Sequence, residues 1–135
     1  MNILIDASAL MAVLIEEPEK EYIVSATKDY ELIAPSILPH EIGNALTRLK
    51  RRQVLNDKQI ILVYNEFLKI PLRFLEIDII NALELACRYS IYAYDAYYLE
   101  MANRYNLPLL TLDKPMKKIA LDLNLRILEE RSESL

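Results

Sequence analysis

Several residue types on which common sites depend are scarce in this sequence. Among its 135 residues there is one cysteine, one histidine and one glycine, and there is no tryptophan. Cys87 alone cannot form an intramolecular disulfide, and together with His40 it provides too few ligands for a structural zinc site. Gly43 alone excludes the loops that bind dinucleotides and phosphates, because each of those loops needs several glycines. The composition favours a reducing, cytoplasmic compartment and argues against zinc and nucleotide-cofactor enzymes.

A basic leader, an uninterrupted apolar run and an excess of positive charge are also missing. The N-terminal stretch MNILIDASALMAVLIEEPEK is partly apolar. Asp6 interrupts its apolar residues, and no Lys or Arg stands at its start as a basic leader would require. We therefore expect neither a signal peptide nor a membrane span. The 16 Lys and Arg residues are outnumbered by 20 Asp and Glu residues, for a formal net charge of -4. Binding of nucleic acid would have to depend on local basic patches or on bound cations.

The pattern of apolar residues predicts strands that alternate with helices. We find no internal repeat, low-complexity tract or linker, and therefore expect one domain over residues 1–135. A chain of this length buries roughly two thirds of its unfolded surface on folding, and it can fold without disulfides or structural metals. The expected strands span residues 2–6, 31–35, 71–77, 108–113 and 126–129. The expected helices run from a Ser8 cap to Ile15, from just after Pro18, over 42–52, from Asn56 to about Ile70, over 78–89, over 94–105, and through a short segment before the last strand.

This alternation predicts an α/β fold with a doubly wound parallel sheet and right-handed crossovers. In such a fold, ligands bind beyond the carboxyl ends of the strands, where the strand order reverses. Asp6 and Asp113 end the first and fourth expected strands, and Glu41 and Asp95 lie in the first turns of two expected helices. Helices of this fold begin at the same edge of the sheet. All four carboxylates can therefore converge on one crevice.

Each acid also has an ordinary structural interpretation. Asp95 fits a helix N-cap, Glu41 fits a first-turn acid that the helix dipole favours, and Asp113 fits a turn before Lys114. Asp6 is harder to explain in this way, because a carboxylate at the end of a buried strand is costly without a partner or a metal. Taken together, the four acids favour a metal site.

Four segments resemble the motifs of PIN-domain ribonucleases, particularly VapC-type toxins. The segments are ILIDASAL at 3–10, EIGNAL at 41–46, YDAYYLEMA at 94–102 and TLDK at 111–114. The resemblance implies that Asp6, Glu41, Asp95 and Asp113 bind one or two Mg²⁺ or Mn²⁺ ions for phosphodiester hydrolysis. It also implies a three-layer α/β/α sandwich with strand order 3-2-1-4-5, a homodimer and, for a toxin, a cognate antitoxin protein.

The function that this resemblance implies is a metal-dependent endoribonuclease acting on RNA, as the toxin of a toxin-antitoxin pair. Two alternatives remain open at the level of sequence. The domain can be a PIN-type nuclease of RNA processing, or a catalytically silent module that acts by binding a partner. The number of ions and the RNA target cannot be inferred from these residues.

Other polar residues have positions from which they can assist the acids. Asn44 follows Glu41 by one helical turn, and Ser8 and Thr111 can orient carboxylates, although Ser8 also fits a helix cap. Arg48 continues the stripe of Glu41 and Asn44 and can contact RNA phosphates. The neighbouring basic residues at 50–52 fit better as partners of the helix dipole.

Two apolar or aromatic groups have no assigned role in the acidic constellation. Six tyrosines occur between Tyr89 and Tyr105, where they fit a core or an interface better than stacking on unpaired bases. The run from Ile60 to Tyr64 is apolar on every side of its expected helix, which predicts that another chain covers part of it.

Overall fold

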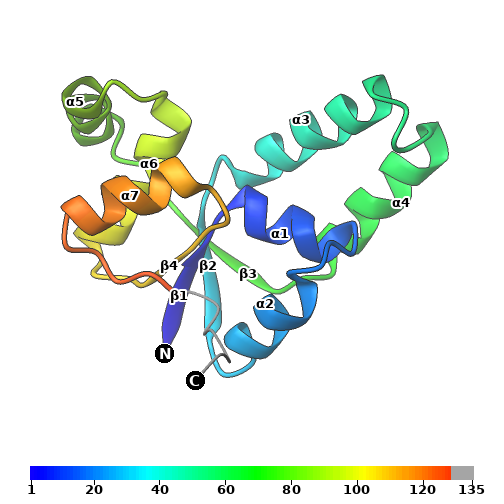
Figure 1. Ribbon diagram of the computed structural model, residues 1–135, viewed down its shortest axis with the longest axis horizontal. Helices are drawn as coiled ribbons and strands as arrows, with labels where there is room; N and C mark the ends of the chain where they lie inside the picture. The colour runs from blue at the N-terminus through cyan, green and yellow to red at the C-terminus, as the bar shows by residue number, and fades with distance from the viewer. Residues whose placement is uncertain (129–135) are drawn as a thin grey trace.

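A four-stranded parallel sheet forms the centre of the computed structural model, which describes residues 1–128. The strand order is β3-β2-β1-β4, and every pair of neighbours is parallel (Figure 1). The central strand β1 is buried on both faces, as its uninterrupted apolar run predicts. The strands are β1 (Asn2–Ile5), β2 (Glu31–Pro35), β3 (Leu72–Leu75) and β4 (Leu109–Leu110).

Helices cover both faces of the sheet and complete the expected three-layer α/β/α sandwich. Figure 1 shows α1 to α4 on one side of the sheet and α5 to α7 on the other. Helices α3 and α4 pack against each other and against α1, and α6 packs between α5 and α7. The helices are α1 (Ala7–Leu14), α2 (Lys20–Thr27), α3 (Leu38–Arg51), α4 (Asp57–Leu68), α5 (Ile79–Tyr89), α6 (Ala93–Arg104) and α7 (Lys114–Asp122).

The expected fifth strand is reduced to a single bridge within the described residues. Ile127 pairs in parallel with Leu109, and the backbone N–H of Leu109 donates to the carbonyl of Arg126 at 2.9 Å. This contact places the segment beyond β4, where the order 3-2-1-4-5 requires it. The last predicted position of that strand, residue 129, lies outside the described residues.

The fourth strand is shorter than the predicted 108–113 because side chains take over its backbone donors. The N–H of Leu112 donates to Ser8 Oγ at 2.9 Å, and the N–H of Asp113 donates to Thr111 Oγ1 at 3.0 Å. Side-chain acceptors of this kind compete with the hydrogen bonds of a strand ladder. The chain therefore leaves the sheet after Leu110.

Two helix starts differ from those predicted, and one agrees. Helix α1 is capped by Asp6 and not by Ser8, so the predicted cap was wrong. Helix α3 begins at Leu38, four residues before the predicted start, because a proline in the first turn removes only an N–H that has no partner in the helix. The predicted capping box of α4 is present, with Asn56 and Gln59 exchanging two hydrogen bonds of 2.8 Å.

The apolar run on α4 is covered on only one side within the described chain. Ile60, Val63 and Tyr64 pack against the core, whereas Ile61 and Leu62 are 61% and 63% exposed. In the part of the chain that the structure describes, no helix combines the length and apolar character needed to cross a membrane.

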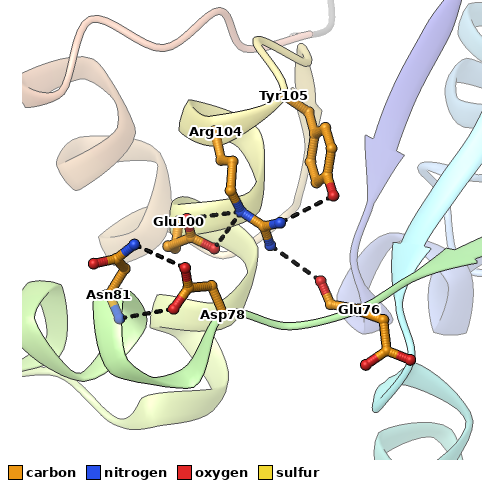
Figure 2. A network of polar contacts seen from close by, with 6 residues as sticks. All are labelled: Glu76, Asp78, Asn81, Glu100, Arg104 and Tyr105. Carbon is orange, nitrogen blue, oxygen red and sulfur yellow. Dashed lines mark hydrogen bonds and ion pairs between the residues drawn. The ribbon is translucent and has the colours of Figure 1, made fainter.

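A polar network connects α6 to the segment between β3 and α5 (Figure 2). Arg104 donates through Nε to both carboxylate oxygens of Glu100, at 3.2 and 3.0 Å. The same guanidinium donates to the hydroxyl of Tyr105 at 2.9 Å and to the carbonyl of Glu76 at 3.0 Å. Glu100 is only 7% exposed, and this network supplies its charge partner.

Candidate functional site

A cavity of about 650 Å³ opens at the carboxyl edge of the sheet, where β1, α3, α6 and the start of α7 meet. The four acids that the sequence singled out, Asp6, Glu41, Asp95 and Asp113, all line this cavity. Ser8, Asn44 and Arg48 line it as well. The structure thus brings together residues that are up to 107 positions apart (Asp6 to Asp113). Their chemical roles remain predictions.

Asp6 is the most deeply buried of the four acids, with 3% of its surface exposed. Its Oδ1 accepts the N–H of Ala9 at 3.0 Å and the hydroxyl of Ser8 at 2.7 Å, and its Oδ2 accepts the hydroxyl of Thr111. Burial raises the pKa of Asp6, these three hydrogen bonds oppose the rise, and the nearby charge of Asp113 adds to it. Within residues 1–128, Asp6 forms no ion pair.

Ser8 and Thr111 attach the start of α7 to Asp6. Each hydroxyl donates to the Asp6 carboxylate and accepts a backbone N–H from the segment that follows β4. Thr111 is fully buried behind the cavity, and Ser8 is half-buried at its wall. The two side chains therefore fix the rotamer of Asp6 and the direction in which the chain enters α7.

Glu41 meets a partner that the sequence analysis missed. The hydroxyl of Tyr98 donates to Glu41 Oε1 at 2.6 Å, and Tyr98 is only 1% exposed. Burial raises the pKa of Glu41 to about 7; Tyr98 opposes the rise, and the charges of Asp6 and Asp95 add to it. One signal was available in the sequence, because Tyr98 follows Asp95 by three residues and so shares its helical face.

Neither Asp95 nor Asp113 has the ordinary structural role that its sequence position also allowed. Asp113 is not only a turn residue but caps α7, by accepting the N–H of Met116 at 3.0 Å. Asp95 lies in the first turn of α6, as predicted, and is not its cap, because the N-cap is Tyr92. Its carboxylate accepts no hydrogen bond from the described residues. Burial and the charge of Asp113 raise the pKa of Asp95.

The four carboxylates are close enough for their charges to act on one another. Asp113 affects the pKa values of Asp6 and Asp95, and Asp6 and Asp95 affect that of Glu41. No Lys or Arg within the described part of the chain forms an ion pair with any of them. Within residues 1–128, no ion pair therefore offsets the electrostatic repulsion among these carboxylates.

This set of donors suits a hard divalent cation. Carboxylate oxygens select Mg²⁺ or Mn²⁺ over softer ions. Within residues 1–128, no group of three or more Asp, Glu, His or Cys side chains is placed so that it could hold a metal ion. Mg²⁺ keeps several waters and is usually bound through only one or two carboxylates. The open, acidic cavity fits that mode of binding.

Asn44 and Arg48 lie on the exposed face of α3 at the rim of the cavity. Asn44, which follows Glu41 by one helical turn, forms no side-chain hydrogen bond with it in the described residues. Glu41 is held by Tyr98 instead. Asn44 and Arg48 are thus available to groups that enter the cavity from solvent.

A family model described as the PIN domain matches residues 3–121. A search of curated proteins finds no match. Among solved structures, PAE2754 from Pyrobaculum aerophilum is 21% identical, with 92% of this chain and 97% of that chain aligned and a TM-score of 0.61.

Two further solved structures share the fold. VapBC2 from Rickettsia felis, crystallised with a DNA fragment from its promoter, is 17% identical over 95% of this chain and 98% of that chain, with a TM-score of 0.69. VapC20 from Mycobacterium tuberculosis, a toxin that cleaves the sarcin-ricin loop, is 15% identical over 87% of this chain and 95% of that chain, with a TM-score of 0.65. At these identities the likeness establishes the fold.

Proposed function

This chain belongs to the PIN domain family, and we propose that it is a divalent-metal-dependent endoribonuclease that hydrolyses phosphodiester bonds in RNA. The observation that carries the proposal is the cavity itself. Four carboxylates line it, two within α3 and α6 and two at the N-caps of α1 and α7, and none of them forms an ion pair within the described chain. Burial of a carboxylate such as Asp6 is costly without a compensating charge, which a bound cation would provide.

Asp6, Glu41, Asp95 and Asp113 would hold one or two Mg²⁺ or Mn²⁺ ions. An ion bound there would supply activation of water and stabilisation of charge on the phosphoryl oxygens. Asp6 accepts three hydrogen bonds, and a carboxylate offers about four acceptor positions, so one position remains for a cation. Asp95, which has no hydrogen bond to the described residues, presents its carboxylate to the cavity without competition.

The surrounding residues position these acids and can move a proton. Ser8 and Thr111 hold the Asp6 carboxylate in one orientation. Glu41, with a pKa raised to about 7, can accept and release a proton near neutral pH while Tyr98 fixes its position. At the rim, Asn44 can hydrogen-bond water, and Arg48 can contact a phosphate of the substrate.

We further propose that the protein is the toxin of a toxin-antitoxin pair and acts in the cytoplasm. The similarity of the fold to VapBC2 and to the toxin VapC20 supports this role. A cognate antitoxin protein would then be its partner. Co-expression with a candidate antitoxin should relieve growth inhibition and block RNA cleavage; growth inhibition without relief would argue against the pairing.

The exposed apolar side chains of α4 support a homodimer. Ile61 and Leu62 lie more than half exposed on a helix whose other face packs on the core. Light scattering at micromolar concentration should give twice the chain mass of 15.7 kDa. A measured mass of one chain, both with and without the antitoxin, would contradict this expectation.

An assay of RNA cleavage tests the proposed activity directly. Single-stranded or looped RNA should be cut internally in Mg²⁺ and remain intact in excess chelator, because unpaired segments can enter a crevice that excludes duplexes. Cleavage of duplex DNA as fast as RNA would contradict the proposed substrate. Absence of any cleavage in Mg²⁺ or Mn²⁺ would favour the alternative, a silent module that acts by binding its partner.

A further inference from the structure

The C-terminal end of α3 and its C-cap carry three arginines that face one groove. Arg48, Arg51 and Arg52, together with Asn44 and Thr47, line a cavity of about 490 Å³. This cavity adjoins the carboxylate cavity, since Asn44, Arg48 and Arg52 line both. We call this cavity the arginine groove. It extends the carboxylate cavity along the exposed face of α3.

The charges in the arginine groove are unneutralised, in contrast to that of the lysine beside it. Lys50 forms an ion pair of 3.0 Å with Asp57 at the start of α4. Arg48, Arg51 and Arg52 form no ion pair or side-chain hydrogen bond with any residue from 1 to 128. In the sequence these basic residues are neighbours at a helix end. In the structure the lysine has an acidic partner, whereas the three arginines line the groove.

Distance along the helix places the groove beyond the reacting centre. Arg48 follows Glu41 by seven residues, which is about 10 Å along a helix axis at 1.5 Å per residue. Arg51 and Arg52 lie about one further turn away. A strand whose scissile phosphate sits among the carboxylates would therefore carry its neighbouring phosphates over the guanidinium groups.

We propose that the arginine groove binds backbone phosphates of single-stranded RNA on one side of the cleavage position. This inference rests on the nuclease function proposed above and adds the path of the substrate. Guanidinium groups match phosphates with paired, charge-assisted hydrogen bonds. For a protein with a net charge of -4, a local basic patch of this kind is what binding to RNA requires. RNA is favoured over an acidic segment of a protein because the groove adjoins the cavity that we propose as the site of RNA cleavage.

The salt dependence of RNA binding tests the proposal. The probe is a fluorescent single-stranded RNA of mixed sequence, bound in chelator so that it is not cut. Each phosphate contact contributes about 0.7 to the slope of log K against log salt for single strands. Arg51→Gln should reduce this slope by about 0.7, and the triple variant R48Q/R51Q/R52Q by about 2. In Mg²⁺, the KM for RNA cleavage should rise more than kcat falls.

Lys50→Gln is the matched control, because it removes the same charge from the same helix outside the groove. It should leave the salt slope and KM unchanged. Equal slopes for wild type and the triple variant, with only a lower melting temperature in the variant, would overturn the proposal and assign the arginines to the helix dipole. Binding of poly-glutamate as tight as that of RNA, with the same dependence on the arginines, would also overturn it.

The inference and the proposed activity can fail separately. If wild type cleaves RNA in Mg²⁺ and the triple variant binds and cleaves it equally well, the arginine groove does not bind RNA, and the nuclease assignment is unaffected. If RNA binds with a salt slope that depends on the arginines but is not cleaved in Mg²⁺ or Mn²⁺, the groove binds RNA and the nuclease assignment is wrong.

Discussion

Two regions of this molecule each bury a carboxylate, and they compensate for it differently. Glu100, 7% exposed, accepts two hydrogen bonds from the guanidinium of Arg104, which is fixed in turn by Tyr105 and by the carbonyl of Glu76 (Figure 2). Asp6, 3% exposed, is held by hydroxyls and a backbone N–H and shares its cavity with three other acids. The first region supplies its own cation, whereas for the second we propose that a bound divalent ion supplies it.

This difference separates structural polar networks from candidate sites. A paired and hydrogen-bonded charge stabilises its surroundings, and removal of one partner leaves the other unpaired in the interior. A group of like charges without a partner raises carboxylate pKa values and reduces stability at neutral pH. Neutralising an acid should therefore destabilise the Glu100 network and relieve repulsion in the cavity.

The largest expected effect is the loss of cleavage on removal of a cavity acid. Asp95→Ala should reduce kcat for RNA on the order of a thousandfold, because several kcal/mol of charge stabilisation depend on the acids. Its stability in chelator should be unchanged or higher, since the carboxylate accepts no hydrogen bond in the described chain and Ala favours a helix. Asp6→Asn, which preserves the cap of α1, should lose cleavage as well. An Asp95→Ala variant that cleaves RNA normally would remove the acid from the site.

The opposite result is expected in the Glu100 network. Arg104→Ala should lower the free energy of unfolding by about 2 kcal/mol, since it leaves Glu100 buried without its cation; the partial exposure of Arg104 keeps the loss below that of a fully buried pair. Cleavage per folded molecule should be unchanged. Urea unfolding and a cleavage assay on the same samples measure both quantities. Wild-type stability for this variant would show that the two regions do not differ as described.

The pH dependence of stability should also distinguish the cavity. Because the pKa of folded Glu41 is raised from 4.5 to about 7, the folded state binds more protons than the unfolded state between these values. The stabilisation is complete below about pH 4.5 and is lost as the pH rises toward 7. In chelator, Glu41→Gln should remove about 1 kcal/mol of this decline, since water at the half-buried group screens part of the effect. Parallel curves for wild type and variant would contradict the assignment.

The smallest effect concerns Tyr98. Tyr98→Phe keeps the buried ring and removes the hydroxyl that donates to Glu41, so the pKa of Glu41 should rise further above its ordinary value. NMR titration of the Glu41 carboxyl in chelator measures the change. Tyr97→Phe is the control on the same helix, and it should leave the titration unchanged. If Tyr98→Phe leaves the pKa of Glu41 unchanged, Tyr98 contributes only to core packing and does not act on Glu41.

The order of strands and helices could be predicted from local sequence patterns. Alternating apolar runs predicted the parallel sheet, and the position of each acid at a strand end or helix start placed all four at one edge. The resemblance to PIN domains supplied the strand order, which β1 to β4 and the bridge at Ile127 match. Capping of α4 was predictable because its two partners, Asn56 and Gln59, are three residues apart.

The remaining details depend on contacts between distant residues. Tyr98 and Glu41 are 57 positions apart, and Thr111 and Asp6 are 105 positions apart, so helical and strand spacing can suggest the hydroxyls but cannot identify the acid that each one meets. Contacts of Ser8 and Thr111 with the backbone after β4 explain two errors. Ser8 binds the segment after β4 instead of capping α1, and β4 ends early because its donors meet Ser8 and Thr111.

The central claim is that the carboxylate cavity binds a divalent cation, and thermal unfolding in chelator and in Mg²⁺ tests it most directly. Mg²⁺ bound only to the folded state at a hundredfold excess over Kd stabilises by about 2.7 kcal/mol, which should raise the wild-type Tm on the order of 10 °C. Asp95→Ala should start from an equal or higher Tm in chelator and gain much less from Mg²⁺. A wild-type Tm that is the same in chelator and in Mg²⁺, or an undiminished gain in Asp95→Ala, would contradict the account.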